Sequence, residues 1–324
     1  MRESNLKTPV LFIIYNRPDL TFKVFQEIRN VRPEKLYIVA DGPKPSKPDD
    51  LKMCLQSRSV INRIDWSCTI KTKFLNENIG CKYNVSNAIK WFFENEEEGI
   101  ILEDDCLPNK SFFEFCAVML NKYRYDNSVG HIGGNNFMNN HNGSSHYFYS
   151  KYAFIWGWAT WRRAWRHYDL NLTSFPDVLV FDRIAQYFRS WQEKYTFYNK
   201  FLQVFEQRKD TWDYQWLFAL WSKNLKSVVP PVNLVKNIGF DNRATHTRVN
   251  RKLDHLFAES IEISDYLSSG DFNDNIDLLF YRLLYRRSFI SNIIIMFKIQ
   301  IFKLKFYAKN AEKKSQPVVL QVSP

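Results

Sequence analysis

The chain has 324 residues and a mass of 38.8 kDa, enough for one large α/β domain or two smaller ones with a full hydrophobic core. Aromatic residues make up 17% of it, while Gly and Pro number only 10 and 12, which excludes the collagen-like and disordered classes. The formal charge is +11, but nine basic residues and one acidic residue lie between 282 and 314. That tail therefore carries +8, and the near-neutral remainder argues against nucleic acid as a partner.

Cysteine usage and hydropathy bear on the compartment. The five cysteines have no C-x-x-C spacing, so neither a disulfide framework nor a zinc site is indicated. The apolar run near the N-terminus is too short for a signal sequence, and no stretch reaches the roughly 20 apolar residues of a membrane span. We therefore expect a cytoplasmic chain.

Strand and helix signals alternate through the first 134 residues. Residues 9–15 (PVLFIIY) form a continuous apolar run, as expected of a strand covered on both faces. A helix follows to about 31, with Asn16 as its cap and Pro18 near its first position. A second strand, KLYIVA, ends at Asp41.

The same alternation continues with a helix over 78–94, the strand GIIL at 99–102, a helix from 111 and the strand VGHIGG at 129–134. Ser111 and Glu114 have the spacing of a capping box at the start of the helix that begins at residue 111. Strands that alternate with helices pair in parallel through right-handed crossovers. The sequence therefore predicts an α/β fold with an open, mostly parallel sheet flanked by helices.

The pattern changes after residue 135. A polar loop leads to a Trp-rich segment over 154–165, and two helical stretches follow, over about 182–206 and 213–222. We expect a donor half over about 1–135 and an acceptor half over about 136–255, together forming one domain. A helical, basic, amphipathic appendage would cover 256–324.

Polar side chains follow three of the predicted parallel strands. Asn16 and Arg17 follow the first strand, Asp41 the second, and three acids (Glu103, Asp104 and Asp105) the strand GIIL. Ligands bind beyond the carboxyl ends of strands in such a sheet. Adjacent carboxylates raise one another's pKa unless a cation relieves the repulsion, and Mg²⁺ or Mn²⁺ suits oxygen ligands. The alternative is a solvated acidic turn.

Four segments together carry a resemblance to a family. ILEDDCLPNKSFF is similar to the D-x-D region of nucleotide-diphosphosugar glycosyltransferases of the GT-A fold, in particular the N-acetylglucosaminyltransferase I type. GWATWRRAW, TWDYQW and NLVKNIGFDNRATHT resemble a bacterial group of such enzymes that assembles surface polysaccharides. The likeness covers roughly residues 9–248.

The resemblance implies roles for individual residues. Asp105 would bind the metal, with His246 completing the site, while Glu103 and Asp104 would lie near ribose and sugar. Asp41 would approach the nucleoside, and Asp213 would be the catalytic base in the first turn of a helix. The alternatives are a structural histidine at 246 and a carboxylate at 213 that only stabilises the helix start.

Four further residues are weaker candidates. Gly80 would bring backbone N–H groups to a donor phosphate at a helix N-terminus, with Lys82 close by. Trp158 and Arg162 are candidates for contact with the acceptor or the diphosphate. Core packing is the alternative for the tryptophan, because aromatic rings serve both purposes.

These inferences combine into one expected function. The chain would be a metal-dependent hexosyl- or N-acetylhexosaminyltransferase that uses Mn²⁺ or Mg²⁺ and moves a sugar from a nucleotide-sugar, with UDP favoured, to a glycan or lipid-linked acceptor. The resemblance implies an inverting displacement. Two alternatives stay open: a sugar-1-phosphate nucleotidylyltransferase, which should have a Gly- and Arg-rich loop after the first strand, and a non-catalytic nucleotide-binding or membrane-scaffold protein.

The basic tail predicts a second kind of partner. On a helix, Ile290, Ile293, Ile294, Phe297, Ile301 and Leu304 form an apolar stripe, while Lys298, Lys305 and Lys309 lie elsewhere. This pattern indicates peripheral attachment to the inner face of an anionic membrane. KIQIFKLKF also alternates as a strand would, and the stripe would alternatively pack on the protein's own body.

Overall fold

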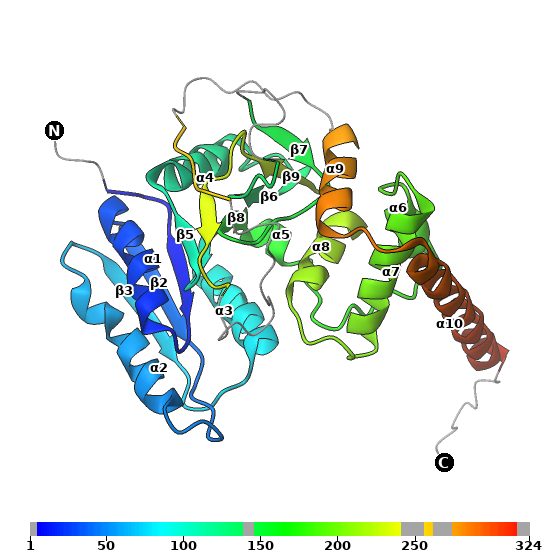
Figure 1. Ribbon diagram of the computed structural model, residues 1–324, viewed down its shortest axis with the longest axis horizontal. Coiled ribbons are helices and arrows are strands. Elements are labelled where there is room, and N and C mark those ends of the chain that lie inside the picture. The colour runs from blue at the N-terminus through cyan, green and yellow to red at the C-terminus, as the bar shows by residue number, and fades with distance from the viewer. Residues whose placement is uncertain (1–4, 139–145, 241–255, 262–273, 316–324) are drawn as a thin grey trace, which may run out of the picture.

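The computed structural model describes residues 5–138, 146–240, 256–261 and 274–315 (Figure 1). Its strands within these ranges form a large sheet in the order β3-β2-β1-β4-β8-β6-β9-β7 and a small sheet that pairs β10 with β5. The strands are β1 (Val10–Ile14), β2 (Lys35–Ala40), β3 (Thr69–Phe74), β4 (Glu98–Glu103), β5 (Cys106–Pro108), β6 (Val129–Gly133), β7 (Phe148–Ser150), β8 (Trp158–Trp161), β9 (Lys226–Val229) and β10 (Val235–Asn237).

The first four strands of the large sheet are parallel. β1 pairs with β2 and β4, and β2 pairs with β3, all in parallel. β8 is antiparallel to both of its neighbours, β4 and β6, whereas β9 is parallel to β6 and β7 is antiparallel to β9. The predicted fold class, an open and mostly parallel α/β sheet, is therefore confirmed, and it has an antiparallel strand at its centre.

Helices cover both faces of this sheet. Alternate residues of β1 point to opposite faces, so Phe12 packs with α1 and α4 while Leu11 packs with α3 and α8. The helices are α1 (Pro18–Val31), α2 (Asp50–Arg58), α3 (Cys81–Asn95), α4 (Lys110–Lys122), α5 (Arg162–Trp165), α6 (Val178–Ala185), α7 (Trp191–Phe205), α8 (Asp213–Ser222), α9 (Asp274–Leu284) and α10 (Phe289–Ser315), with the 3₁₀ helix η1 (Ser59–Arg63) after α2.

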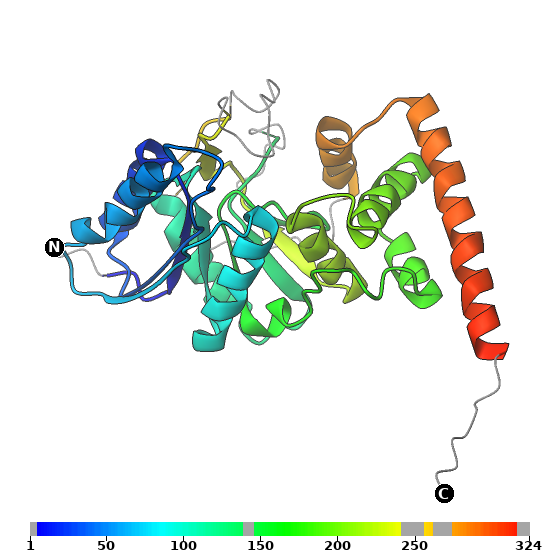
Figure 2. The ribbon, with the colours of Figure 1, turned by 90° about the horizontal axis from the view of Figure 1, so that it is seen from below.

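A further hydrophobic core lies beside the sheet, among the helices of the second half. Phe197 and Phe201 of α7, Phe218 of α8 and Phe280 of α9 are buried in it. Ile299 of α10 is buried in the same core. Figure 2 shows α10 along the edge of the molecule farthest from α1 and α2, with α7 on its inner side. The predicted helical appendage is thus packed onto the body of the protein.

Two local predictions differ from the structure, and one alternative left open by the sequence is decided by it. Asn109, rather than Ser111, caps α4 and accepts a hydrogen bond from the N–H of Phe112, because Ser111 bonds the backbone of Ile261 instead. The helix predicted over 182–206 is two helices, α6 and α7, and Ser190 caps the second. The residues of KIQIFKLKF are helical and belong to α10, so the alternation that suggested a strand was misleading.

Candidate functional site

The carboxyl ends of β1, β2 and β4 meet at one edge of the sheet and bring their polar side chains together. The Arg17 guanidinium donates to Asp104 Oδ1 at 2.7 Å and to Asp105 Oδ2 at 2.9 Å. The N–H of Tyr15 donates to the other oxygen of Asp104 at 3.0 Å. Arg17 is therefore a built-in cation that relieves the repulsion within the acidic triplet.

Burial and mutual repulsion raise the pKa of two acids of the triplet. Burial, together with the neighbouring Asp105 and Asp104, raises the pKa of Glu103 to about 8. Burial also raises the pKa of Asp104 to about 6, although Arg17 acts in the opposite direction. Burial and its acidic neighbours thus favour the neutral form of Glu103.

A cavity of about 90 Å³ opens beside the triplet. Residues from four elements or their ends line it, among them Arg17, Asp41, Cys81, Asn84 and Glu103. Asn84 is 4% exposed, and its side-chain oxygen has no hydrogen-bond partner among the described residues. A buried acceptor without a partner costs free energy, so a hydroxyl or N–H group of a bound molecule is a fitting partner for it.

Asp41 holds the loop that leads into α3. One carboxylate oxygen accepts from the N–H groups of Gly42 and Ile79 at 2.8 and 3.0 Å. The other accepts from the N–H of Gly80 at 3.1 Å and from the side-chain amide of Asn78 at 3.0 Å. Asp41 therefore positions the start of α3, and the N–H of Gly80 bonds this carboxylate in the described structure.

The other predicted donor-side residues are close to this edge. Gly80 adopts φ +83, a conformation that favours glycine, directly before α3. Lys82 is 5% exposed, and its ammonium lies over the ring of Tyr83. Asn16 donates to Asp50 at the start of α2, and the hydroxyl of Tyr15 donates to the same carboxylate.

A loop after β10 closes over Asp105. Because β10 pairs with β5, the strand that follows the triplet, the N–H of Ile238 reaches the carbonyl oxygen of Asp105 at 2.8 Å. A Cβ on Gly239 would lie 2.8 Å from Arg17 Nη1 and still closer to the carboxylate of Asp105. The close approach of this loop therefore requires glycine at 239, a role that the sequence analysis missed.

Asp213 joins the same site from the second half of the chain. It is the first residue of α8, is half-buried, and accepts a hydrogen bond from the hydroxyl of Thr211. Its charge raises the pKa of both Glu103 and Cys81, after the larger effect of burial. The fold thus brings the predicted base and the acidic triplet into one electrostatic neighbourhood.

A buried lysine, also missed from the sequence, lies beside Tyr214, the residue after Asp213. Lys200 of α7 donates to the hydroxyl of Tyr214 and lies 4.3 Å from the centre of that ring. Burial lowers the pKa of Lys200 to about 7, and the positive charges of Lys209 and Arg287 act in the same direction, whereas Asp213 opposes them. This side of the site is therefore rich in positive charge.

Two predicted residues, Trp158 and Arg162, lie away from this edge. Trp158 is 1% exposed in β8, where it stacks on His131 and Trp212 in the core. Arg162 pairs with Glu97, next to the start of β4, whereas the acidic triplet lies at the other end of that strand. His246 lies outside the described residues.

The donor set at the triplet suits only one kind of metal site. Among the described residues, no group of three or more His, Cys, Asp or Glu side chains is placed to hold a metal ion. Arg17 bonds both Asp104 and Asp105, but the Asp104 side chain is only 5% exposed, whereas that of Asp105 is 20% exposed. The set therefore fits a Mg²⁺ or Mn²⁺ ion that takes one protein carboxylate and completes its shell with phosphates of a bound molecule.

Comparison with known proteins adds a likeness of fold. No family model matches the chain. No curated protein sequence matches it either. The chain is similar in structure to a mannosyltransferase from Pyrobaculum calidifontis in complex with GDP-Man and Mn²⁺, with a TM-score of 0.38 and 13% identity over 67% of this chain and 69% of that one.

Two similar structures belong to other transferases. A UDP-glucose pyrophosphorylase complexed with UDP-glucose has a TM-score of 0.36 and 8% identity over 69% of this chain and 90% of its own. A 4-diphosphocytidyl-2C-methyl-D-erythritol synthase from Anaerococcus prevotii has a TM-score of 0.32 and 10% identity over 68% and 88%. At such low scores and identities these similarities carry no argument about activity.

Proposed function

We propose that the chain is a glycosyltransferase that moves a sugar from a nucleotide-sugar donor to an acceptor hydroxyl. The observation that carries this proposal is the Arg17-bridged acidic triplet at the carboxyl edge of the sheet, beside a cavity lined by Cys81. Cys81 packs against the same hydrophobic cluster as Trp212, the residue directly before Asp213. Arg17 and a divalent cation at Asp105 would supply positive charge for a diphosphate. Asp213 would supply a carboxylate that accepts a proton. A sugar transfer needs both.

The connection between β1 and α1 favours this function over a nucleotidylyltransferase. Only Tyr15, Asn16 and Arg17 separate the strand from the helix. The side chains of Tyr15 and Asn16 donate to Asp50, and the side chain of Arg17 donates to Asp104 of the triplet. A Gly- and Arg-rich phosphate loop of the kind expected for a nucleotidylyltransferase has no room there.

In the proposed reaction each residue has one task. The acceptor oxygen bonds to the anomeric carbon, the bond from that carbon to the diphosphate oxygen breaks, and the acceptor proton passes to the Asp213 carboxylate. Arg17 donates hydrogen bonds to the departing diphosphate. Asn84 accepts from a hydroxyl or N–H group of the donor, and Asp41 keeps the loop before α3 in place.

The proposal includes a divalent cation at Asp105, shared with the donor phosphates. When bound, Mn²⁺ or Mg²⁺ supplies positive charge that stabilises the diphosphate leaving group. The resemblance implies His246 as a second ligand. The same proposal includes a UDP-linked hexosyl or N-acetylhexosaminyl donor and an inverting outcome. It also includes an acceptor in bacterial surface-glycan assembly.

The experiment is a screen of nucleotide-sugars for release of nucleoside diphosphate by the full chain, with Mn²⁺, with Mg²⁺ and with chelator. With an active donor, Asp213→Asn should lower turnover by roughly 10²-fold or more while donor affinity stays nearly unchanged, because the amide cannot take a proton. Asp126→Asn, which alters an exposed acid before the start of β6, is the matched control and should stay within a few-fold of the parent.

Two results would remove the proposal. Near-normal sugar transfer by folded Asp213→Asn would exclude it as the base. Formation of a nucleotide-sugar from a nucleoside triphosphate and a sugar phosphate, without any release of nucleoside diphosphate, would identify a nucleotidylyltransferase instead.

A further inference from the structure

The last helix, α10, has two apolar faces, and only one of them is covered. Ile295 and Ile299 are 6% and 0% exposed and pack in the same core as α7, while Asn292 accepts a hydrogen bond from Thr196 of α7. A second set of apolar side chains is 52 to 72% exposed: Ile290, Ile294, Phe297, Ile301 and Leu304. These five residues are called the outer stripe.

Helical geometry places the outer stripe opposite the packed face. Its residues are spaced by four, three, four and three positions, so at about 100° per residue they lie in one narrow row. Ile295 and Ile299 lie about half a turn away from that row. Figures 1 and 2 both show the outer side of α10 turned away from the sheet and from α7.

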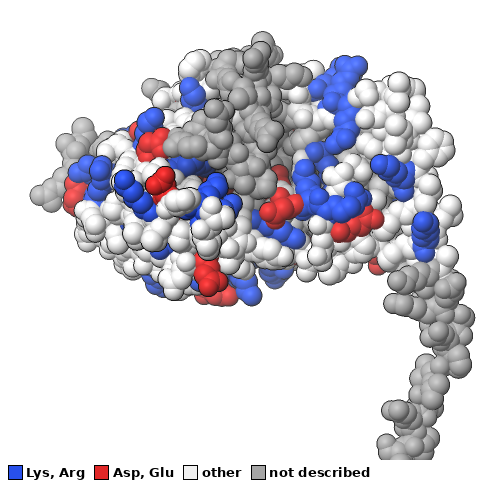
Figure 3. Space-filling model, turned by 60° about the horizontal axis from the view of Figure 1, so that its bottom comes forward, with Lys and Arg blue, Asp and Glu red and all other residues white. Residues whose placement is uncertain are grey.

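Basic residues accompany the outer stripe. Lys298 and Lys305 are exposed on the same helix, and no acidic residue occurs between 289 and 305. Arg282, Arg286 and Arg287, just before the helix, are also exposed. Figure 3 shows Lys and Arg side chains gathered on the helical side of the molecule.

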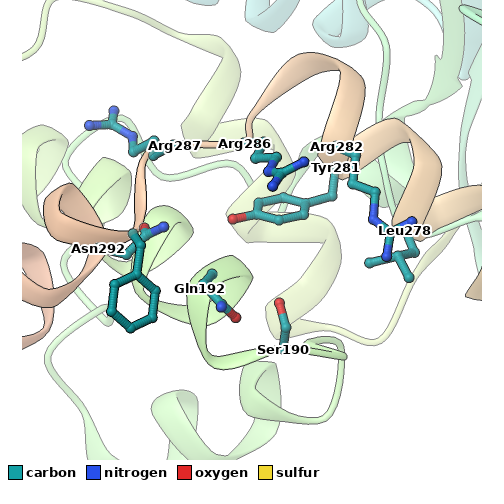
Figure 4. A pocket seen from close by; sticks show the side chains of 9 residues that line it. Ser190, Gln192, Leu278, Tyr281, Arg282, Arg286, Arg287 and Asn292 are labelled. Carbon is teal, nitrogen blue, oxygen red and sulfur yellow. The ribbon is translucent and has the colours of Figure 1, made fainter.

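A pocket of about 310 Å³ lies at the start of α10 and contains these three arginines. Ser190 and Gln192 from the start of α7 and Tyr281 of α9 line it with them (Figure 4). No described acidic residue forms an ion pair with Arg282, Arg286 or Arg287. The pocket therefore presents guanidinium groups whose charge is not compensated by the described part of the protein.

We infer that the outer stripe and the arginine pocket together bind the surface of an anionic lipid bilayer. The stripe enters the boundary between head groups and acyl chains, and the arginines hold a lipid phosphate. The apolar side chains fit the acyl-chain boundary of such a surface, and the neighbouring cations fit its anionic head groups. This inference concerns attachment and does not depend on the proposed reaction.

The alternative occupant is a second copy of this chain. The spacing of the outer stripe would suit a coiled coil, in which charges of opposite sign normally flank the apolar row. Here two copies would bring Lys298 and Lys305 against further lysines, without acidic partners on the facing segment.

A membrane-spanning helix is a different way to bind a bilayer. None of the helices in the described ranges is long and apolar enough to cross one. An interfacial helix is the mode that remains.

The inferred surface lies next to the acceptor side of the candidate site. The ammonium of Lys200 lies 5.2 Å from the centre of the ring of Tyr285, which directly precedes Arg286 in the chain, and donates to the hydroxyl of Tyr214. Tyr214 is the residue directly after Asp213. A bilayer held at the arginine pocket is therefore close to the part of the protein where an acceptor would meet Asp213.

Flotation of the full chain with vesicles tests the inference. We expect binding to vesicles of phosphatidylcholine with one third phosphatidylglycerol, weaker binding to pure phosphatidylcholine, and a decrease as salt rises. Ile294→Glu with Phe297→Glu should abolish binding. Arg286→Gln with Arg287→Gln should weaken it about tenfold or more, since each basic side chain near such a surface contributes about 1 kcal/mol.

Matched controls lie elsewhere on the chain. Leu51→Glu with Leu55→Glu alters two exposed leucines of α2, and Lys23→Gln with Lys90→Gln removes two exposed charges. Both should bind vesicles like the parent. Each variant is first checked for an unchanged unfolding midpoint and far-UV circular dichroism.

Four results would overturn the inference. They are failure of the parent to float with anionic vesicles, an equal loss of binding in the α2 control, and displacement by inorganic phosphate at constant ionic strength, which would assign the pocket to a free anion. The fourth is a parent dimer that the stripe variant converts to a monomer without any vesicle binding, which would assign the outer stripe to a second copy.

Discussion

Gly239 is the residue at which backbone geometry and the candidate site are most directly linked. In Gly239→Ala the added methyl group would meet Arg17 Nη1 and the Cβ of Asp105 at 2.8 Å, well inside normal contact. We expect the Arg17–Asp105 pair to be displaced, donor turnover to fall by about 10²-fold, and stability to fall by about 1–3 kcal/mol. Steady-state kinetics and urea unfolding measure both quantities.

Gly133→Ala is the matched control for that variant. A methyl group there would find its nearest neighbour, His131 Nε2, at 3.5 Å, which is ordinary contact. This variant should keep the turnover of the parent. If Gly239→Ala behaves in the same way, the loop after β10 takes no part in positioning Asp105.

His131 provides a pH-dependent test of the core. Its ring is fully buried, accepts a hydrogen bond from Trp216 at Nδ1 and bonds the carbonyl of Phe154 through Nε2. Burial lowers its pKa to about 3, from an ordinary value of 6.5. The folded state therefore binds fewer protons than the unfolded state between these values, and stability is lost as the pH falls below about 6.5.

The measurement is urea unfolding of the parent and His131→Gln between pH 7 and pH 4. Histidine should account for about 3 kcal/mol of stability lost over this range, and the glutamine variant should lack that part. His167→Gln, which alters a less buried ring, should retain most of the parent's pH dependence. Parallel profiles for the parent and His131→Gln would contradict the assignment.

At the scale of elements, α10 offers two isoleucines with opposite surroundings. Ile299 is fully buried against the second-half core, whereas Ile301 is 52% exposed on the outer stripe. Ile299→Ala should cost about 2–4 kcal/mol, because it leaves a cavity between α10 and α7, while Ile301→Ala should stay within about 0.5 kcal/mol. Thermal unfolding of the two variants measures the difference.

Equal costs for these two variants would mean that α10 packs through a different face. A larger cost for Ile301→Ala would also reverse the assignment of the outer stripe.

The elements predicted from the sequence were those with strong burial patterns. β1, β2 and β4 are continuous apolar runs because helices cover both of their faces. β3 was missed because it is an exposed edge strand, TIKTKF, whose lysines discourage pairing with other chains. β8 was hidden in the Trp-rich segment, since nothing local reveals that Trp158 pairs with Ile101 across the sheet.

At the scale of the whole molecule, a buried polar network ties the second-half helices to the sheet. Lys151 pairs with Glu193 at 2.7 Å, and both side chains are at most 3% exposed. Ser150 and the N–H of Lys151 donate to Asp277 of α9, and the hydroxyl of Tyr152 donates to Glu193 of α7. The last residue of β7 and the two residues after it thereby hold two helices at once.

Glu193→Gln should leave the buried ammonium of Lys151 without its main partner and cost about 3–5 kcal/mol. The exposed pair of Glu206 and Arg208 provides the control, because Glu206→Gln should cost less than about 1 kcal/mol. Denaturant unfolding followed by tryptophan fluorescence compares them. A cost for Glu193→Gln no larger than that of the control would mean that the network does not hold the two parts together.

The candidate site could be predicted in part. The strand-end residues Arg17, Asp104 and Asp105 are neighbours in space as the parallel pattern indicated. The sequence did not show that Arg17 itself compensates the acids, because that contact joins positions 87 and 88 residues apart. Asn84 and Gly239 were missed for a related reason: their significance comes from an unpaired buried oxygen and a close backbone approach, which only three dimensions reveal.

The order of strands in the sheet also has a consequence for synthesis on the ribosome. β1 must wait for β4, which begins almost ninety residues later, at Glu98, and β6 must wait for β9, which begins almost a hundred residues later, at Lys226. Pairings of such separation form slowly. The loop that closes over Asp105 follows later still, at Gly239, so a nascent chain carries an open acidic edge until nearly three quarters of its length has been made.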